Sequence, residues 1–179
     1  MSFGKDILLS CVVMMHVSFV VSEPANNLSE CMKKFEAPLK NLRHAEKEYV
    51  RYMFQTYPAH YYKNNGCSSL EGITFPKENN TEEALAFMVN ISNCIDILPA
   101  IIKNLTINGK LPVNDMISNI TTFHKQFQGV LLHFGQNATA KECNVNDKND
   151  YVKKQIGLKI ICNTRRWVEK YTSPNIHGV

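Results

Sequence analysis

The chain has 179 residues and a formal net charge of +4, and 44% of its residues are hydrophobic. This length allows one domain with a hydrophobic core. Basic residues alternate with acidic ones, as in KKFEAPLKNLRHAEKEYVR, which is typical of solvated helix faces and argues against nucleic-acid binding. A weak attraction to anionic polysaccharides outside the cell stays an alternative.

Residues 1–22 have the pattern of a secretory signal peptide. Lys5 supplies a charged start, residues 7–21 are mostly apolar, and Val20-Val21-Ser22 offers small residues for cleavage. A membrane anchor is the alternative, but the run is short for a span and no positive cluster follows it. We therefore expect a secreted, extracellular product with one domain over residues 23–179, in which no segment inserts into a membrane.

The cysteine count is odd once Cys11 leaves with the signal peptide. An oxidising compartment favours pairing among the five that stay, which are Cys31, Cys67, Cys94, Cys143 and Cys162. Cys94 lies in the apolar run MVNISNCIDIL, where a free cysteine behaves as a small buried hydrophobe. We therefore predict Cys94 to be the free thiol. No Cys-x-x-Cys motif or Cys/His cluster has zinc spacing, so no metal site is expected.

Six N-glycosylation sequons agree with secretion. They begin at Asn27, Asn79, Asn90, Asn104, Asn119 and Asn137. Because a glycosylated asparagine has to be exposed, Asn90 and Asn119 are expected on the outward faces of their helices.

The first helix is predicted from Cys31 to about Phe54, after a flexible polar stretch at residues 23–30. Its apolar side is formed by Leu39, Leu42, Tyr49, Val50 and Met53. Its outward side is formed by Lys40, His44, Lys47 and Arg51. Residues 55–80 contain Tyr-Pro, Asn-Gly and Phe-Pro turn signals and form a long connection.

The second helix is predicted from Asn80 to about Asn104. Asn80 is a candidate N-cap, and Glu83 stands where a capping box places its second member. Residues 106–112 then form a short connection with an Asn-Gly turn.

The third helix carries the clearest apolar stripe of the chain, which runs from Ile117 to Phe134. Asn114 or Asp115 is predicted to cap its start, and Gly135 is suited to end it in a left-handed conformation. Two histidines on this helix are expected at the surface, and not as ligands: His124 and His133. The polar residues 136–149 make the second long connection.

The last helix is predicted from Asp150 to Tyr171, with short polar side chains at 147, 149 and 150 as candidate caps. Its wet face is formed by Arg165, Arg166, Glu169 and Lys170. Tyr151 and Lys154 are three residues apart, so they project from nearly the same side of its first turn.

The lengths of the connections predict how the helices are arranged. A long link that crosses a bundle lets consecutive helices run parallel, whereas a short link makes them antiparallel. Long, short and long links in this order predict an all-α, long-chain four-helix bundle with up-up-down-down topology and two crossover loops.

Three patches resemble the leukaemia inhibitory factor, cardiotrophin and ciliary neurotrophic factor group of the interleukin-6 cytokine family, and leukaemia inhibitory factor most. YVKKQIGLKIICNTRRW resembles the final helix of the group, where an aromatic-x-x-Lys pair is followed by a Gly step. CSSLEGITFPKENNTEEA resembles the end of its first long loop, and FQGVLLHFG the end of its third helix. The similarity extends diffusely over residues 35–171.

The resemblance implies a secreted, monomeric ligand that bridges two receptors and thereby triggers JAK/STAT signalling. A leukaemia inhibitory factor receptor-like chain would bind the start of the last helix at Tyr151 and Lys154, although the family has Phe in place of Tyr151. The shared signal transducer of the family would bind a second surface formed by Lys40, His44, Lys47, Gly129 and His133. The family pattern also implies the disulfides Cys67–Cys162 and Cys31–Cys143, although the family's last-helix cysteine directly follows the Gly.

Other readings stay open. Tyr151 can be a hydrophobic cover and Lys154 a solvated charge, while Gly129 can be a packing accommodation. The chain can also be a helical cytokine subunit like the interleukin-12 alpha chain, linked to a partner through Cys94, or a secreted lipid carrier. No nucleophile elbow, HExxH motif, phosphate loop or acid pair is found, so neither an enzyme nor a cofactor is expected.

Overall fold

The computed structural model describes residues 24–54, 67–68, 70, 73–77, 80–105, 113–136, 143, 145 and 148–172, with side chains from residue 28 onward. The expected signal peptide at residues 1–22 lies outside these ranges, as do the turn at 106–112 and most of the long connection at 55–80.

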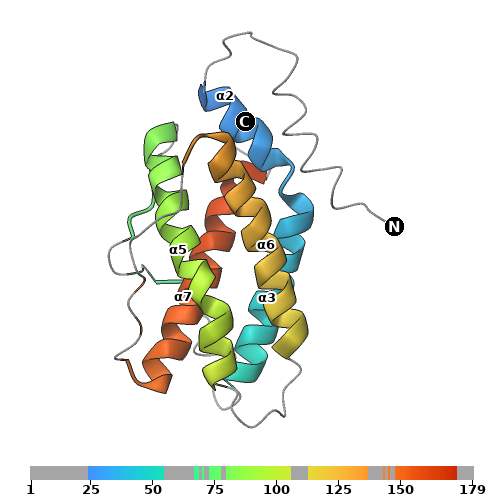
Figure 1. The fold of residues 1–179 in the computed structure, drawn as a ribbon, viewed down its shortest axis with the longest axis vertical. Coiled ribbons are helices and arrows are strands. Elements are labelled where there is room, and N and C mark those ends of the chain that lie inside the picture. The colour runs from blue at the N-terminus through green and yellow to red at the C-terminus, as the bar shows by residue number, and fades with distance from the viewer. Residues whose placement is uncertain are drawn as a thin grey trace, which may run out of the picture.

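The described part of the chain is all-α, as predicted: 83% of it is helical and it contains no strand. The helices are α2 (Pro24–Lys33), α3 (Glu36–Met53), α5 (Thr81–Leu105), α6 (Val113–His133) and α7 (Asp150–Thr172). In Figure 1 the four longer helices lie side by side, and α2 lies at one end of them. Both α3 and α5 pack against α6 and α7, while α2 packs against α7 and α5.

Aromatic side chains from α5, α6 and α7 and from the break between α2 and α3 meet in the core. Trp167 of α7 is fully buried, and its ring lies 5.4 Å from that of Phe87 and 5.9 Å from that of Phe127. Phe35 meets the Phe127 ring edge-on at 6.2 Å. Full burial of one such side chain contributes about 1.5–3 kcal/mol, so this cluster fixes how the helices stack.

The N-terminal stretch corrects the prediction. Residues 24–33 form helix α2 and are not a flexible segment, because Leu28 and Met32 stand one turn apart and are buried in the core. The helix predicted from Cys31 is interrupted at residues 34–35 before α3 begins. Pro38 lies in the first turn of α3, where its missing N–H leaves no helical hydrogen bond unmade.

The starts of two helices are capped by asparagines named in advance. The Asn80 side chain accepts a hydrogen bond from the Glu83 N–H at 3.0 Å, although the Glu83 carboxylate accepts from the Lys77 N–H instead of closing the capping box. The Asn149 side chain accepts from the Val152 N–H at 3.0 Å. These caps satisfy N–H groups that the first turn of a helix leaves unpaired.

The two ends of α6 differ in how well they were predicted. The helix begins at Val113, so Asn114 and Asp115 lie inside its first turn and do not precede it. Gly135 has a φ of +66°, as expected of a left-handed terminus. The Gln136 N–H bonds to the Leu131 carbonyl at 2.9 Å, which completes a Schellman motif.

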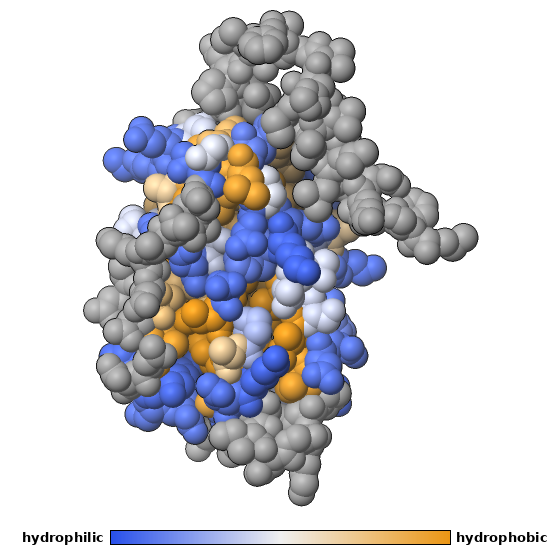
Figure 2. Space-filling model, in the orientation of Figure 1, coloured by the Kyte–Doolittle hydropathy of each residue, from blue (hydrophilic) through white to orange (hydrophobic). Residues whose placement is uncertain are grey.

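Helix α5 is, among the described residues, the one helix that is long and apolar enough to cross a membrane. Length and composition alone therefore do not bear out the expectation that no segment of the domain inserts into a membrane. However, 50% of its most apolar window is buried inside the structure, including Met88, Ile91 and Ile95. A helix that packs in the core needs this apolar composition. Part of the apolar surface stays on the outside: Figure 2 shows it on the lower half of the face where α5 and α6 lie.

Candidate functional site

The first turn of α7 presents an aromatic side chain to solvent. Tyr151 is 55% exposed and is, with Leu132, one of two large hydrophobic residues exposed in the described part of the chain. Lys154 is half-buried one turn further on. The Asn149 cap orders the backbone of this turn, so both side chains start from a fixed position.

A buried tyrosine of α3 holds the same turn from the inner side. Tyr49 is fully buried, and its hydroxyl donates to the Lys154 carbonyl at 3.1 Å. Burial raises the pKa of Tyr49, so the hydroxyl keeps the proton that it donates. Gly157 permits this approach, because a Cβ atom there would lie 2.1 Å from the Tyr49 hydroxyl oxygen. The bond uses the backbone of Lys154 and leaves its ammonium group for other contacts.

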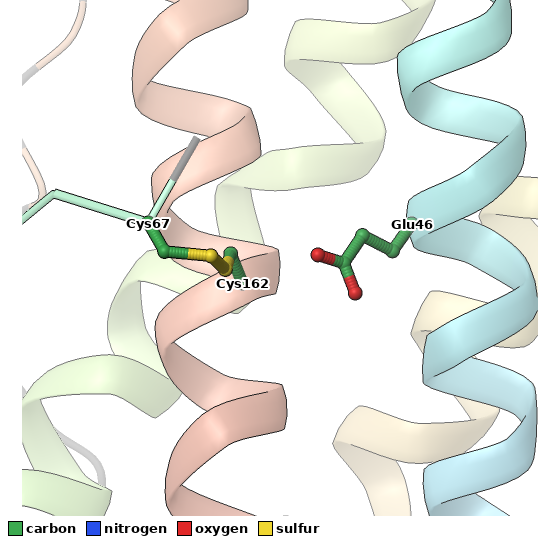
Figure 3. Close-up of side chains that lie close together, drawn as sticks. All are labelled: Glu46, Cys67 and Cys162. Carbon is green, nitrogen blue, oxygen red and sulfur yellow. A yellow bond between two sulfur atoms is a disulfide. The ribbon is translucent and has the colours of Figure 1, made fainter. Parts of the chain in front are cut away.

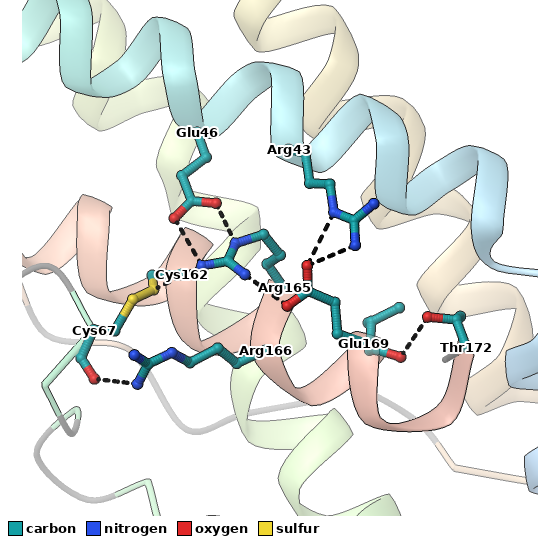
Figure 4. A network of polar contacts seen from close by, with 9 residues as sticks. Arg43, Glu46, Cys67, Cys162, Arg165, Arg166, Glu169 and Thr172 are labelled. Atoms are coloured by element: carbon teal, nitrogen blue, oxygen red, sulfur yellow. Dashed lines mark hydrogen bonds and ion pairs between the residues drawn. A yellow bond between two sulfur atoms is a disulfide. The ribbon is translucent and has the colours of Figure 1, made fainter. Parts of the chain in front are cut away.

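An ion-pair network joins the middle of α3 to the second half of α7 (Figure 4). Glu46 is 3% exposed and pairs with Arg165, whose Nη1 also lies 2.6 Å from Glu169 Oε2. Arg43 binds the other oxygen of Glu169 at 2.9 Å. The prediction that Arg165 belongs to a wet face is therefore wrong: the buried Glu46 carboxylate requires a cation, and Arg165 supplies it.

The described residues form two disulfides, of which one was predicted. Cys67 is bonded to Cys162 as expected. Cys143 is bonded to Cys94, with 5.1 Å between their Cα atoms, so the predicted Cys31–Cys143 bridge is wrong and Cys94 is not a free thiol. The prediction failed because an apolar helical position was taken to exclude a bridge, although a disulfide is itself apolar. Cys31 lies half-buried against the core on α2.

Glu46, Cys67 and Cys162 place three potential metal-ligating atoms within 4.8 Å of one another (Figure 3). The two sulfurs are bonded to each other and are not thiolates, which are the form that binds metals. The carboxylate is already paired with Arg165. This cluster therefore ties α3, α7 and the Cys67 segment together, and Arg166 adds a hydrogen bond to the Cys67 carbonyl at 3.3 Å.

The second predicted surface is divided between two helices that pack together. Lys40, His44 and Lys47 are all exposed on α3. Gly129 and His133 on α6 are half-buried. The His133 ring packs edge-on against Phe134 at 5.0 Å, and its Nδ1 atom is buried with no hydrogen-bond partner among the described residues. The residues on α3 are thus accessible to a partner, whereas those on α6 are only partly accessible.

His124 is buried and not at the surface as predicted. It is 7% exposed, its Nε2 lies 2.9 Å from Ser92 Oγ, and its Nδ1 lies 3.7 Å from Asp96 Oδ1. Burial lowers the pKa of His124. The order of these groups resembles a Ser-His-Asp triad, but Ser92 is 0% exposed and no substrate can reach it. His124 stands one turn after Ile120 in the apolar stripe, and this spacing was the signal for its burial.

The sequons that the structure describes lie on α5 and α6. Asn104 is exposed, while Asn90 and Asn119 are half-buried and only partly meet the expectation of outward faces. The Asn27 side chain and all of Asn79 and Asn137 lie outside the described residues. Neither α3 nor α7 contains a sequon.

Comparison with known proteins adds no relative: no protein-family model, curated protein or solved structure matches this chain.

Proposed function

We propose that this protein is a secreted cytokine-like ligand with a four-helix bundle of up-up-down-down topology over residues 23–179. The colour gradient of Figure 1 supports this topology, since α3 and α5 run in one direction while α6 and α7 run in the other. Each helix of one pair packs against both helices of the other pair, as such a bundle requires. In the helical cytokines this arrangement leaves the outer faces of the helices for receptors.

The exposed Tyr151 beside Lys154 is the observation that carries the proposal. An exposed aromatic ring on a capped helix can fill a receptor pocket, and a neighbouring ammonium can meet an acidic group or a carbonyl at its edge. Aromatic and cationic side chains on rigid elements are typical of binding hot spots, where truncation costs about 2 kcal/mol or more. The Tyr49 contact with the Lys154 carbonyl preorganises this turn, and less ordering entropy is then lost on binding.

The partner proposed for this turn is a leukaemia inhibitory factor receptor-like chain. A second partner, the signal transducer shared by the interleukin-6 family, would bind the surface of α3 and α6 that contains Lys40, His44, Lys47, Gly129 and His133. A monomer that holds both chains would bring their cytoplasmic kinases together and trigger JAK/STAT signalling. In this proposal the ligand has no catalytic role and needs no cofactor.

Receptor binding by matched variants tests the site. Tyr151→Ala and Lys154→Ala should each weaken binding to the receptor-like ectodomain by about 30-fold or more, which corresponds to about 2 kcal/mol. Lys170→Ala is the control, because Lys170 is an exposed lysine near the other end of α7. Equal affinities for all four proteins would remove the site assignment.

Neither alternative function gains support. A subunit linked to its partner through Cys94 would need that thiol, which the Cys94–Cys143 bond occupies. A lipid carrier would need a cavity inside the bundle, where the described core instead brings together Phe35, Phe123, Phe127 and Trp167.

A further inference from the structure

The outward side of α3 carries a row of basic residues, which we name the α3 basic stripe: Lys40, His44, Lys47 and Arg51. All four are exposed, and their spacings of four, three and four residues keep them on one side of the helix. The row extends about 16 Å along the helix axis, at about 1.5 Å per residue. It thus forms a straight line of basic side chains and not a compact cluster.

The acidic residues of α3 pair with the stripe only at its Arg51 end. Glu46 is buried and is committed to Arg165 on the inner side. Glu48 is mostly buried and lies 3.8 Å from Arg51 at one end of the stripe. Glu36 is exposed but precedes the stripe by one turn. Lys40, His44 and Lys47 make no ion pair with any residue that the structure describes.

Two neighbouring features leave the stripe accessible. The helix packs against α6 and α7 through its inner side, and in Figure 1 it forms an outer edge of the bundle. No sequon lies on α3, so no N-linked glycan is expected on this helix.

The composition of the stripe also suits a polyanion, in addition to the receptor chain proposed for Lys40, His44 and Lys47. Protein interfaces centre on buried aromatic or aliphatic anchors and are depleted in lysine. The stripe has no such anchor, since the exposed large hydrophobic residues in the described ranges are Tyr151 on α7 and Leu132 on α6. A linear polymer with regularly spaced anionic groups matches a straight row of cations through charge alone.

We propose that the α3 basic stripe binds a sulfated extracellular polysaccharide. This inference goes beyond receptor binding. It rests on the proposed function only in requiring that the protein is secreted. Lys40, His44 and Lys47 are also residues of the proposed second receptor surface, so a bound polysaccharide would compete with the signal transducer there. The polymer would hold the ligand in the matrix while Tyr151 and Lys154 stay uncovered.

Heparin affinity in the absence of any receptor tests this proposal. The secreted, glycosylated protein is compared with a stripe variant, K40Q/K47Q/R51Q. The control variant K77Q/K125Q/K170Q removes the same charge at exposed positions on a loop, α6 and α7. Circular dichroism verifies that all three proteins are folded. Binding to immobilised heparin is measured from 50 to 500 mM salt, with N- and O-desulfated heparin as further probes. A separate assay measures binding to the ectodomain of the signal transducer.

The stripe variant is expected to lose at least tenfold in heparin affinity, to elute at lower salt, and to show a shallower dependence of binding on salt, because fewer counterions are released. The control variant should lose less than threefold, and desulfated heparin should bind weakly. If both variants lost the same heparin affinity, binding would depend only on the net charge of the protein, and the proposal would be overturned. Absence of heparin binding at 150 mM salt would also overturn it, and stripe-dependent binding to the ectodomain alone would assign the face to a protein partner.

Discussion

Replacing Gly157 by alanine tests how α7 is anchored. In most exposed helical positions this change stabilises a protein by about 1 kcal/mol, because alanine is the better helix former. Here the new Cβ would lie 2.1 Å from the Tyr49 hydroxyl oxygen and 2.8 Å from its Cζ atom. The ring of Tyr49 is fully buried and would have to move.

The magnitude follows from three contributions. Overpacking costs about 1–3 kcal/mol. Displacing the ring breaks the hydrogen bond to the Lys154 carbonyl and leaves a buried hydroxyl unpaired, at a further cost of about 1–3 kcal/mol. The gain in helix propensity offsets about 1 kcal/mol. Gly157→Ala should therefore lower the free energy of unfolding by about 3 kcal/mol, measured by urea denaturation followed by circular dichroism.

A double-mutant cycle with Tyr49→Phe isolates the contact. Phenylalanine keeps the ring but lacks the oxygen that lies nearest to the new Cβ atom. The cost of Gly157→Ala should fall by about 1–2 kcal/mol in this background. If Gly157→Ala stabilised the protein, or if its cost were the same in both backgrounds, the proposed anchoring of α7 by Tyr49 would be refuted.

Three further outcomes are expected. Glu46→Gln removes one of the two carboxylates that pair with Arg165 and should cost about 1.5–3 kcal/mol in urea denaturation, whereas Glu48→Gln should cost less than about 1 kcal/mol; similar costs would contradict the network. Burial lowers the pKa of His124 below its ordinary value of 6.5. As the pH falls, His124 therefore becomes protonated in the unfolded chain at a higher pH than in the folded chain. The stability contributed by neutral His124 is then complete above pH 6.5 and is lost as the pH falls toward the folded-state pKa. His124→Gln should weaken this pH dependence in unfolding experiments at pH 5–8, and an unchanged profile would count against it. Peptide mapping without reduction should find Cys67–Cys162 and Cys94–Cys143, and a Cys31–Cys143 peptide would contradict the structure.

The sequence predicted the helical class because periodic apolar residues decide it locally. The sequence also identified three residues at helix ends: Asn80, Asn149 and Gly135. Each of them caps or ends its helix through the backbone of residues close to it in sequence, so its role can be predicted locally. Helix α2 was missed, since its two inward residues, Leu28 and Met32, stand in an otherwise polar segment whose helix forms through tertiary packing.

The candidate site was predictable only in part. Tyr151 at an exposed first turn followed from helix periodicity and the resemblance. The partners of Glu46 and Arg165 could not be predicted, because they are 119 residues apart and the pairing depends on how α3 meets α7. A glycine inside a strongly helical segment is unusual, so the sequence marks Gly157 as a special position. The cause, which is the close approach of the Tyr49 hydroxyl, can be seen only in the folded structure.

Receptor activation tests the central proposal most directly. The purified protein is applied to cells that carry the leukaemia inhibitory factor receptor and the shared signal transducer, or only one of the two, and STAT phosphorylation is measured. The proposal predicts a response only where both chains are present, and a strongly reduced response to Tyr151→Ala at equal protein concentration. No STAT phosphorylation by the folded wild-type protein in cells with both chains would contradict the proposed function.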